Sequence, residues 1–380
     1  MLEFGVIGYG GRISSIVDLL FKSGEARPVA IMDTDIRAAK ARAEEKGYSD
    51  LRYYSDADEM LQKEQLDGVL VGTRCSTHTH YAVLVAKYKI PLFLEKPVCI
   101  HEEDLDRLRA ILPDMDDITV VSFPLRTSML LQKVKEITDT GRLGTIEHVQ
   151  AYNNVPYGRG YYHKWYRDEN ETGGLFLQKA THDLDYINYL LGDNRPVRIC
   201  AVKSKQVFKG NEPAGKLCAD CDKTDTCPES PKNVKKNGDR YIIGPYCCFA
   251  TDTGNEDSGS AIIEYESGMH VVYSQNFIAR NGAGKRGARL IGYRGTLEFD
   301  WVTNTIRVFR HLENINEEYV LNGTSGSHFG GDANLCENFL AVMTGKARSI
   351  APLHEGILSA SMCLAARRSS EEHVFVDIRE

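Results

Sequence analysis

A lysine and a histidine are the residues of this sequence best placed to move a proton. Lys96 lies in Glu95-Lys96-Pro97, directly after a short apolar run that is typical of a buried parallel strand. A lysine at the carboxyl end of such a strand points into the crevice where open α/β sheets bind ligands, and the following proline restricts its backbone to an extended conformation. His182 lies later in the chain. An imidazole can accept a hydroxyl proton while an ammonium group stabilises the resulting alkoxide.

The helix predicted over 175–191 places the polar neighbours of His182 one turn away. Gln178 precedes the histidine by four residues, Lys179 precedes it by three, and Asp185 follows it by three. Side chains at these spacings share or border one helix face. An aspartate one turn away can hold His182 in one tautomer and leave its other nitrogen for a substrate. Lys179 is therefore a third catalytic candidate, or a structural ion-pair partner.

The start of the chain has the strand, glycine turn and helix that a dinucleotide site requires. Leu2–Ile7 is an apolar run long enough for a buried strand, and helical spacing of apolar residues begins at Ile13. A glycine turn between them lets the backbone approach a pyrophosphate, which the helix N-terminus would bind. Ile13 replaces the last glycine of G-x-G-x-x-G, so the match is incomplete. The turn residues expected to contact the dinucleotide are Gly8, Tyr9, Gly10, Gly11, Arg12 and Ile13.

Further cofactor contacts are expected where later strands end. Asp33 follows the second predicted strand, 28–32, and an acidic side chain there binds ribose hydroxyls and repels a 2′-phosphate, which favours NAD over NADP. Strands over 68–73, 90–94 and 118–123 alternate with helices, which predicts a doubly wound parallel sheet. The other candidates at these strand ends are Thr73, Arg74, His78, Glu95 and Lys96.

In their order, these motifs give the chain a resemblance to the Gfo/Idh/MocA oxidoreductases, which include glucose–fructose oxidoreductase and inositol dehydrogenase. The likeness is carried by 8–11, Asp33, 73–78, 95–97, 141–144, and Gly173-Gly174 followed by His182 and Asp185. It implies an N-terminal Rossmann domain and a C-terminal α/β domain with a large, mostly antiparallel sheet that is often used for oligomerisation. The expected domains are 1–123, for NAD, and 124–380, for substrate and oligomerisation.

The resemblance also implies a reaction. Family members usually transfer a hydride between NAD(P) and a secondary alcohol of a sugar, cyclitol or related polyol. Lys96 would lie beside the nicotinamide and the substrate, and His182 would be the acid/base. If Lys179 converged with Lys96, mutual repulsion would lower the pKa of one of the two lysines. The chain departs from the family pattern at Arg74, where a proline is usual, and at Gln178, where many members have an aspartate.

These departures keep two alternatives open. One is a redox-cycling glycosidase or lyase that oxidises a sugar, eliminates and re-reduces it while NAD is retained. The other is a non-catalytic NAD-dependent sensor, although a sensor does not need the proton-transfer pair Lys96 and His182. We expect the main function to be an NAD-dependent dehydrogenase acting on a carbohydrate, polyol or glycoside.

An aromatic stretch over 157–167 precedes the helix that carries His182. Aromatic faces can stack on the C–H faces of a sugar ring while basic groups bond its hydroxyls, so Tyr161 and Trp165 are predicted substrate contacts. The alternative is a packing or subunit-contact loop. The remaining substrate candidates are Arg126, Gln178, Lys179 and Asp185.

A cysteine-rich insertion is expected over about 211–250. Cys218, Cys221 and Cys227 lie in a polar stretch and are followed by Cys247-Cys248. Three or four of these thiolates could hold a structural zinc, and free thiols or a redox-labile disulfide are the alternatives.

Length, charge and composition limit the number of domains and the kinds of partner that we expect. The chain has 380 residues, a formal net charge of −7 and ten cysteines. This length predicts two domains, and the charge gives no basic footprint for nucleic acid. No apolar run could span a membrane and no secretory signal is evident, so we expect a cytoplasmic protein. The resemblance implies a homo-oligomer, a dimer or tetramer. Period-two alternation predicts antiparallel strands over 197–208, 260–266, 269–277, 288–291, 296–301 and 305–310, followed by helices over 332–344 and 353–370.

Overall fold

The computed structural model describes residues 1–236, 244–322 and 327–379. The chain divides into two compact units. The first contains residues 1–132 together with 324–361, and the second contains 133–323 together with 362–380. Each unit is built around its own sheet.

The sheet of the first unit is parallel, with strand order β3-β2-β1-β4-β5-β6. Every residue of β4, β5 and β6 is buried, as expected for parallel strands that are covered on both faces. The order reverses between β1 and β4, and ligands bind such sheets at the carboxyl ends of the strands near this point. The strands are β1 (Leu2–Ile7), β2 (Ala26–Met32), β3 (Arg52–Tyr54), β4 (Gly68–Val71), β5 (Leu92–Leu94) and β6 (Thr119–Val121). The predicted doubly wound sheet is confirmed.

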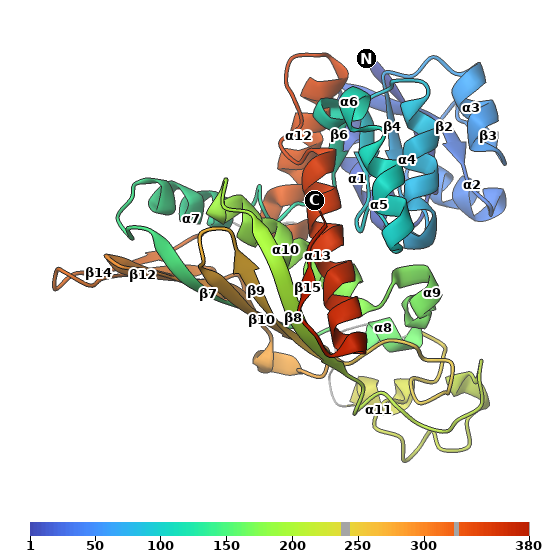
Figure 1. Cartoon of the computed structure of the whole chain (residues 1–380). Helices are drawn as coiled ribbons and strands as arrows, with labels where there is room; N and C mark the ends of the chain where they lie inside the picture. Colours follow the sequence, from blue (N-terminus) through green and yellow to red (C-terminus); the bar gives the residue numbers. More distant parts are fainter. Residues whose placement is uncertain (237–243, 323–326, 380) are drawn as a thin grey trace. The chain divides into compact units, whose positions relative to one another are not determined.

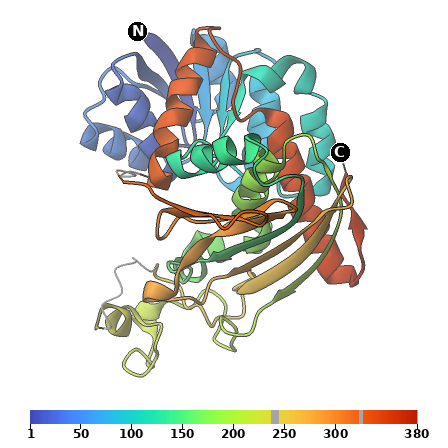
Figure 2. The same ribbon diagram turned by 90° about the vertical axis from the view of Figure 1, so that its left-hand side faces the viewer.

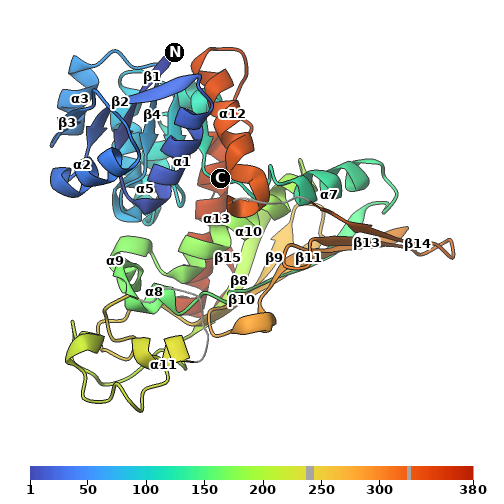
Figure 3. The ribbon, with the colours of Figure 1, turned by 180° about the vertical axis from the view of Figure 1, so that it is seen from behind.

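Helices cover both faces of this sheet. Helices α4 and α5 lie on the face toward the viewer in Figure 1, and α1 and α12 lie side by side on the opposite face, seen in Figure 3. Asp35 caps α2 and Asp56 caps α3, because each carboxylate accepts a hydrogen bond from a first-turn amide. The helices are α1 (Gly11–Lys22), α2 (Ile36–Glu45), α3 (Ala57–Lys63), α4 (His78–Ala86), α5 (Glu102–Arg109), α6 (Leu112–Met115) and α12 (Gly331–Met343).

The sheet of the second unit has nine strands in the order β14-β13-β12-β11-β7-β10-β9-β8-β15. Neighbouring strands are antiparallel except β7 and β10, which are parallel. The strands are β7 (Ile146–Asn154), β8 (Pro196–Ser204), β9 (Ser258–Tyr265), β10 (His270–Asn276), β11 (Lys285–Gly292), β12 (Gly295–Asp300), β13 (Thr305–Arg310), β14 (Asn316–Val320) and β15 (Val376–Asp377). The predicted mostly antiparallel sheet is confirmed, but the sequence reasoning missed its central strand, β7.

One face of this sheet forms the core with α10, and the strands run side by side in Figure 2. Along β7 the residues that face the core are buried and those between them are more exposed, which is the period-two pattern of a half-covered strand. Helix α10 spans Leu175–Leu191, as predicted, and most of its residues are buried. The other helices are α7 (Met129–Asp139), α8 (Gly160–His163), α9 (Glu169–Thr172), α11 (Pro231–Lys236) and α13 (Leu353–Glu372).

Among the described residues, no helix combines the length and apolar character that crossing a membrane would require.

Candidate active site

The glycine turn of the first unit fits closely against the end of β4. Gly8 has a φ of +79°, and a Cβ atom built on it would lie 2.5 Å from Cγ2 of Thr73. Gly10 and Gly11 are different, because a Cβ atom on Gly11 would meet nothing within 4 Å and one on Gly10 only the carbonyl oxygen of Gly72, at 3.8 Å. The turn therefore leaves open space over the N-terminus of α1. A backbone cradle of this kind fits the pyrophosphate of a dinucleotide.

Ile13 does not disrupt this arrangement. A Cβ atom on Gly72 would lie 2.4 Å from the Cβ atom of Ile13, so the side chain of Ile13 occupies the space that Gly72 leaves open. The last glycine of the dinucleotide motif normally allows this helix to pack closely on the sheet. In this chain the glycine that allows the helix and the sheet to approach is Gly72, which directly follows β4, and the helix contributes Ile13.

Asp33 lies at the end of β2, where the sequence predicted a ribose-binding carboxylate. Its Oδ2 accepts a hydrogen bond of 2.7 Å from the backbone amide of Tyr9, and its Oδ1 accepts one of 2.8 Å from the amide of Asp35. These two bonds fix the carboxylate beside the glycine turn. The ribose contact itself stays a prediction.

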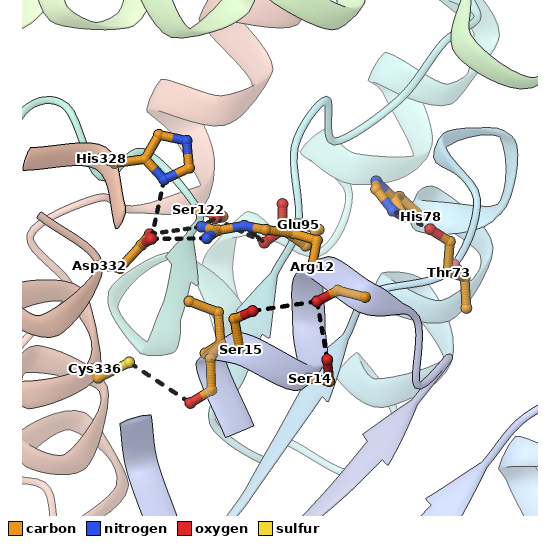
Figure 4. A network of polar contacts seen from close by, with 12 residues as sticks. Arg12, Ser14, Ser15, Thr73, His78, Glu95, Ser122, His328, Asp332 and Cys336 are labelled. Carbon is orange, nitrogen blue, oxygen red and sulfur yellow. Dashed lines mark hydrogen bonds and ion pairs between the residues drawn. The ribbon is translucent and has the colours of Figure 1, made fainter. Parts of the chain in front are cut away.

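Arg12 is the centre of a polar network that sequence reasoning did not foresee (Figure 4). Its Nε donates to Oε1 of Glu95 at 2.9 Å, and its Nη2 donates to Ser122 at 3.0 Å. Both terminal nitrogens bind the carboxylate of Asp332, at 2.8 and 2.7 Å. His328 lies 3.0 Å from the same carboxylate. Burial by itself would raise the pKa of Asp332, but Arg12 and His328 hold it far below its usual range.

The network positions the strand end that carries Lys96. Glu95 is held by Arg12 and also accepts a hydrogen bond of 2.9 Å from Ser122. On the other side, Nδ1 of His78 donates to the carbonyl oxygen of Pro97 at 2.7 Å. Burial lowers the pKa of His78. The Lys96–Pro97 bond is cis. Both neighbours of Lys96 are therefore fixed by side chains from other elements of the first unit.

Two further candidates of the first unit lie at different places. Arg74 is exposed and precedes the short helix Cys75–Thr77. Arg126 is buried, donates a hydrogen bond of 3.0 Å to the carbonyl oxygen of Ile350 and lies 3.8 Å from Glu355. The structure thus gives Arg126 a bracing role within the first unit, and its predicted substrate contact stays a prediction.

In the second unit, a glycine pair and a glutamate define the start of α10. Gly173 and Gly174 have φ values of +73° and +90°, which residues with a side chain rarely adopt. The carboxylate of Glu256 accepts a hydrogen bond from the amide of Phe176 in the first turn. The helix that carries His182 therefore begins at a defined residue. The glycines allow the turn before it, and Glu256 binds a first-turn amide that has no partner within the helix.

Asp183 is a carboxylate on α10 with several partners, although the sequence analysis gave it no role. It is fully buried and accepts hydrogen bonds of 2.8 Å from Asn153 on β7 and 2.8 Å from Tyr273 on β10. Arg286 on β11 donates to it from Nε at 2.7 Å. Asp183 therefore ties the helix to three neighbouring strands. Gln178, His182 and Asp185 lie on the same helix and are buried too, and the predicted pairing of His182 with Asp185 stays a prediction.

The aromatic stretch contacts this helix through Lys179. Its ammonium nitrogen lies 4.9 Å from the ring centroid of Tyr157 and 5.2 Å from that of Tyr161. Trp165 stacks on Tyr166 at 3.8 Å, and Tyr161 packs edge-on against that ring at 5.2 Å. The structure thus brings Tyr161 and Lys179 together, and the substrate contacts predicted for Tyr161, Trp165 and Lys179 stay predictions.

The predicted zinc site is not supported. Burial raises the pKa of Cys218 to about 11, with further contributions from Cys247, Cys227 and Cys221, so these thiols lie near one another. All cysteines are free thiols, Cys248 included. Within the parts of the chain that the structure describes, no group of three or more His, Cys, Asp or Glu residues could hold a metal ion.

Together, the six-stranded order, the glycine cradle and Asp33 define a dinucleotide-binding protein of the Rossmann type. The family described as "Oxidoreductase family, NAD-binding Rossmann fold" matches residues 2–123, and the GFO/IDH/MocA C-terminal domain matches residues 131–298. The chain belongs to the Gfo/Idh/MocA family of oxidoreductases, as its resemblance predicted, and its first domain is of that family's NAD-binding Rossmann type.

Several curated relatives share part of this sequence. The YteT protein of Bacillus subtilis (strain 168) is 26% identical over 320 residues, which cover 74% of this chain and 73% of YteT. The myo-inositol 2-dehydrogenase of Thermotoga maritima is 28% identical over 195 residues, which cover 50% of this chain and 55% of that enzyme. The chain thus matches little more than half the length of this inositol dehydrogenase.

Solved structures share the fold over the whole chain. Levoglucosan dehydrogenase in complex with NADH and levoglucosan has a TM-score of 0.76 at 16% identity and covers 100% of both chains. Myo-inositol 2-dehydrogenase from Lactobacillus plantarum has a TM-score of 0.73 at 17% identity and covers 100% of this chain and 99% of its own. At these identities the likeness concerns the fold.

The residues that sequence reasoning missed are Asp183, Glu256, Arg286 and Asp332. Each of these residues binds a partner that is far away in the sequence, so no local sequence pattern indicates its role. Asp332 carried the only usable signal, because it follows Gly330-Gly331 at the start of a predicted helix.

Proposed function

We propose that this protein oxidises or reduces a secondary alcohol of a sugar, cyclitol or glycoside with NAD as hydride carrier. The observation that carries the proposal is the fixed strand end at Lys96, which lies in the same unit as an open glycine cradle and the carboxylate of Asp33. Relatives named inositol 2-dehydrogenase and a structural neighbour named levoglucosan dehydrogenase support the substrate class.

In this proposal each unit contributes one proton-handling group. NAD accepts the hydride when it is bound. The glycine turn 8–13 and Asp33 bind it, with Thr73, Arg74 and His78 along the same edge. Lys96 donates a hydrogen bond to the reacting oxygen and stabilises its developing charge, while His182 takes the hydroxyl proton. Residues 1–123 would thus bind the cofactor, and residues 124–380 would bind the substrate.

The test is turnover of a panel of inositols, free sugars and glycosides, with NADH absorbance and product mass followed together. We expect NADH to form with some compounds, and kcat to fall by roughly 100-fold or more in Lys96→Met and in His182→Ala, which is the size expected for an acid/base group. The exposed Lys87→Met and His80→Ala are matched controls and should keep wild-type rates. Wild-type rates in the Lys96 and His182 variants would reject the assigned roles.

A second candidate function is the redox-cycling glycosidase or lyase. It is favoured by Gln178 and Lys179, which replace the residues usual for a simple dehydrogenase. Cleavage of a glycoside with no accumulation of NADH and no added cofactor would select it. Bound NAD with no conversion of any compound would instead favour the sensor.

We also propose that the second unit forms a homo-oligomer through the face of its sheet that α10 does not cover. Cys200, Ile262 and Val272 are paired neighbours in one cross-strand row, and Ile262 and Val272 are 45% and 38% exposed. The row continues through Gln150 to the oppositely charged pair Arg289 and Glu298. Exposed apolar residues beside a charged row are typical of a self-associating surface.

Sedimentation velocity tests the oligomer. The wild type should sediment as a dimer or tetramer, and Ile262→Glu should dissociate it, because a carboxylate on a buried apolar patch is strongly unfavourable. Val374→Glu is the control, since Val374 is similarly exposed and lies outside the sheet. An unchanged oligomer in Ile262→Glu would place the interface elsewhere.

A further inference from the structure

Two cysteines of the cysteine-rich insertion lie at the two ends of one short turn. The short 3₁₀ helix Cys218–Asp220 has Cys221 as its C-terminal cap, and the amide of Cys221 donates to the carbonyl oxygen of Cys218 at 3.4 Å. In a helix of this type, side chains three positions apart lie above one another, with a rise of about 2.0 Å per residue. Such a turn separates the two Cα atoms by about 6 Å, within the range of about 4.4 to 6.8 Å that disulfides span.

The turn is fixed by a side chain of the insertion and is open to small molecules. The hydroxyl group of Thr224 donates to the carbonyl oxygen of Cys221 at 2.8 Å and to that of Cys218 at 3.4 Å. Both cysteines are free, partly exposed thiols, and Ala219 and Asp220 between them are exposed. The two thiols are therefore held close together at a place that a reagent in solution can reach.

The surroundings of the two thiols differ. Sγ of Cys218 donates to the carbonyl oxygen of Tyr246 at 3.5 Å, and burial raises the pKa of Cys218 to about 11. A thiol of this kind is a poor nucleophile at neutral pH, because the thiolate is the reactive form. Cys221 interacts electrostatically with Lys216, and a neighbouring ammonium group favours a thiolate. Cys221 is therefore the thiol that is better placed to attack.

We propose that Cys218 and Cys221 form a reversible disulfide by exchange with a small disulfide such as oxidised glutathione. The thiolate of Cys221 attacks one sulfur of the reagent, the bond between the two reagent sulfurs breaks, and one half leaves and takes up a proton. Cys218 then loses its proton and displaces the second half from Cys221. Two protein thiols are oxidised to one disulfide, and one small disulfide is reduced to two thiols. This chemistry needs neither NAD nor a sugar, so it is independent of the proposed reaction.

Tyr246 connects the cysteine pair to the aromatic stretch 157–167. The amide of Tyr246 donates to the carbonyl oxygen of His163 at 3.2 Å. Nδ1 of His163 lies 2.6 Å from the carbonyl oxygen of Tyr246, the same oxygen to which Cys218 donates. The guanidinium group of Arg167 lies 5.1 Å from the centroid of the Tyr246 ring. A sulfur in a disulfide has no hydrogen, so oxidation removes the Cys218 donor from this oxygen, and we expect the aromatic stretch to be held less tightly.

The first experiment maps the disulfide in the full-length chain. Reduced protein is equilibrated with oxidised glutathione, the remaining thiols are alkylated under denaturing conditions, and trypsin releases both cysteines on the single peptide 217–223. We expect this peptide to carry no alkyl group and to be lighter by two hydrogen atoms, and dithiothreitol should reverse the change. The buried thiols Cys336 and Cys363 are internal controls and should be alkylated in every sample.

Two serine variants separate the roles of the thiols. Cys218→Ser should keep glutathione on Cys221 as a mixed disulfide, because the thiol that displaces it is missing. Cys221→Ser should leave Cys218 reduced under the same conditions. In the wild type, an unlinked peptide 217–223, or linkage of either cysteine to Cys227 or Cys247 instead, would overturn the proposal. No turnover is measured, so failure of the proposed function is distinguishable from failure of this inference.

The second experiment follows the contact between the insertion and the aromatic stretch. Hydrogen exchange of peptides from 157–167 is compared between the reduced and the oxidised wild type. Oxidation should make this exchange faster by roughly twofold, a small factor because a thiol is only a weak donor. Cys221→Ser treated in the same way should show no change, and peptides from β1 serve as internal controls. Equal exchange in the two states of the wild type would overturn the connection through Tyr246.

Discussion

The carboxylate of Asp33 can hold the glycine turn and bind ribose hydroxyls at the same time. One oxygen is fixed by the amide of Tyr9, and the other is fixed by that of Asp35. Each carboxylate oxygen can accept more than one hydrogen bond, so ribose hydroxyls can still bind. Its negative charge would repel a 2′-phosphate at the same position.

Asp33→Asn should change the choice of cofactor. The amide keeps an oxygen for Tyr9 but removes the charge, so we expect binding of NADP to improve by about tenfold and binding of NAD to weaken by a similar factor, about 1.4 kcal/mol each. Fluorescence titration with both dinucleotides measures this ratio. The exposed Asp50→Asn serves as control. An unchanged ratio would show that Asp33 does not face the ribose.

Asp183 shows how a residue can matter through its neighbours alone. It touches β7, β10 and β11 through Asn153, Tyr273 and Arg286. These bonds fix the rotation of α10 about its axis, and with it the direction of Lys179 and His182. Sequence reasoning gave weight to the H-x-x-D spacing of Asp185 and overlooked the aspartate next to the histidine.

At the scale of elements, the packing of α1 on β4 depends on a complementary pair. Gly72 has no side chain where Ile13 has a branched one, and the two backbones approach closely for that reason. The incomplete glycine motif is thus completed by a different strand. A local motif search examines only one side of such a contact.

The start of α13 contains a titratable pair. Nδ1 of His354 lies 2.8 Å from Oδ2 of Asp116, and Glu355 lies 3.4 Å from Nε2. These hydrogen bonds raise the pKa of His354 to about 9. Because the folded pKa exceeds the unfolded value of about 6.5, the stabilisation is fully present below that pH and is lost as pH rises through about 9.

His354→Gln should therefore destabilise the protein in a pH-dependent way. We expect a loss of about 1 kcal/mol near pH 6, a figure that allows for the 41% exposure of the imidazole and its screening by solvent. Near pH 10 the variant and the wild type should unfold at the same urea concentration, since the wild-type histidine is then neutral. A difference that does not change with pH would assign the effect to packing.

At the scale of the whole molecule, residues far apart in sequence complete the cofactor unit. Arg12 and Asp332 are separated by 320 positions, yet they form a bidentate ion pair with Asp332 only 3% exposed. Helix α12 packs beside α1, so the chain returns to its first unit after building most of the second.

Asp332→Asn tests how much the ion pair between Arg12 and Asp332 stabilises the first unit. Removal of one charge from a buried pair leaves Arg12 partly uncompensated, and we expect a loss of about 3 kcal/mol in the free energy of unfolding of the first unit. Urea unfolding with and without NAD measures it. Asp114→Asn removes an exposed pair with Lys89 and should cost less than about 1 kcal/mol. Equal effects of the two substitutions would mean that Arg12 is satisfied by Glu95 and Ser122 alone.

The sequence by itself determined the elements whose signal is local. The glycine turn, the buried runs of the parallel strands and the helix 175–191 follow from residue spacing, because periodicity reports which face of a segment is buried. The ordered motifs also indicated the family, the NAD-binding domain and the second, mostly antiparallel sheet.

Only the tertiary structure decided which distant segments meet. It placed β7 at the centre of the second sheet, although its mixed polar pattern gave no strand prediction, and it joined residues 324–361 to the first unit. It also paired Arg12 with Asp332, Asp183 with Arg286, and Lys179 with Tyr157. The physical reason is that these contacts depend on which strands pair and which helices pack, and that choice is set by the whole core and not by any local run of residues.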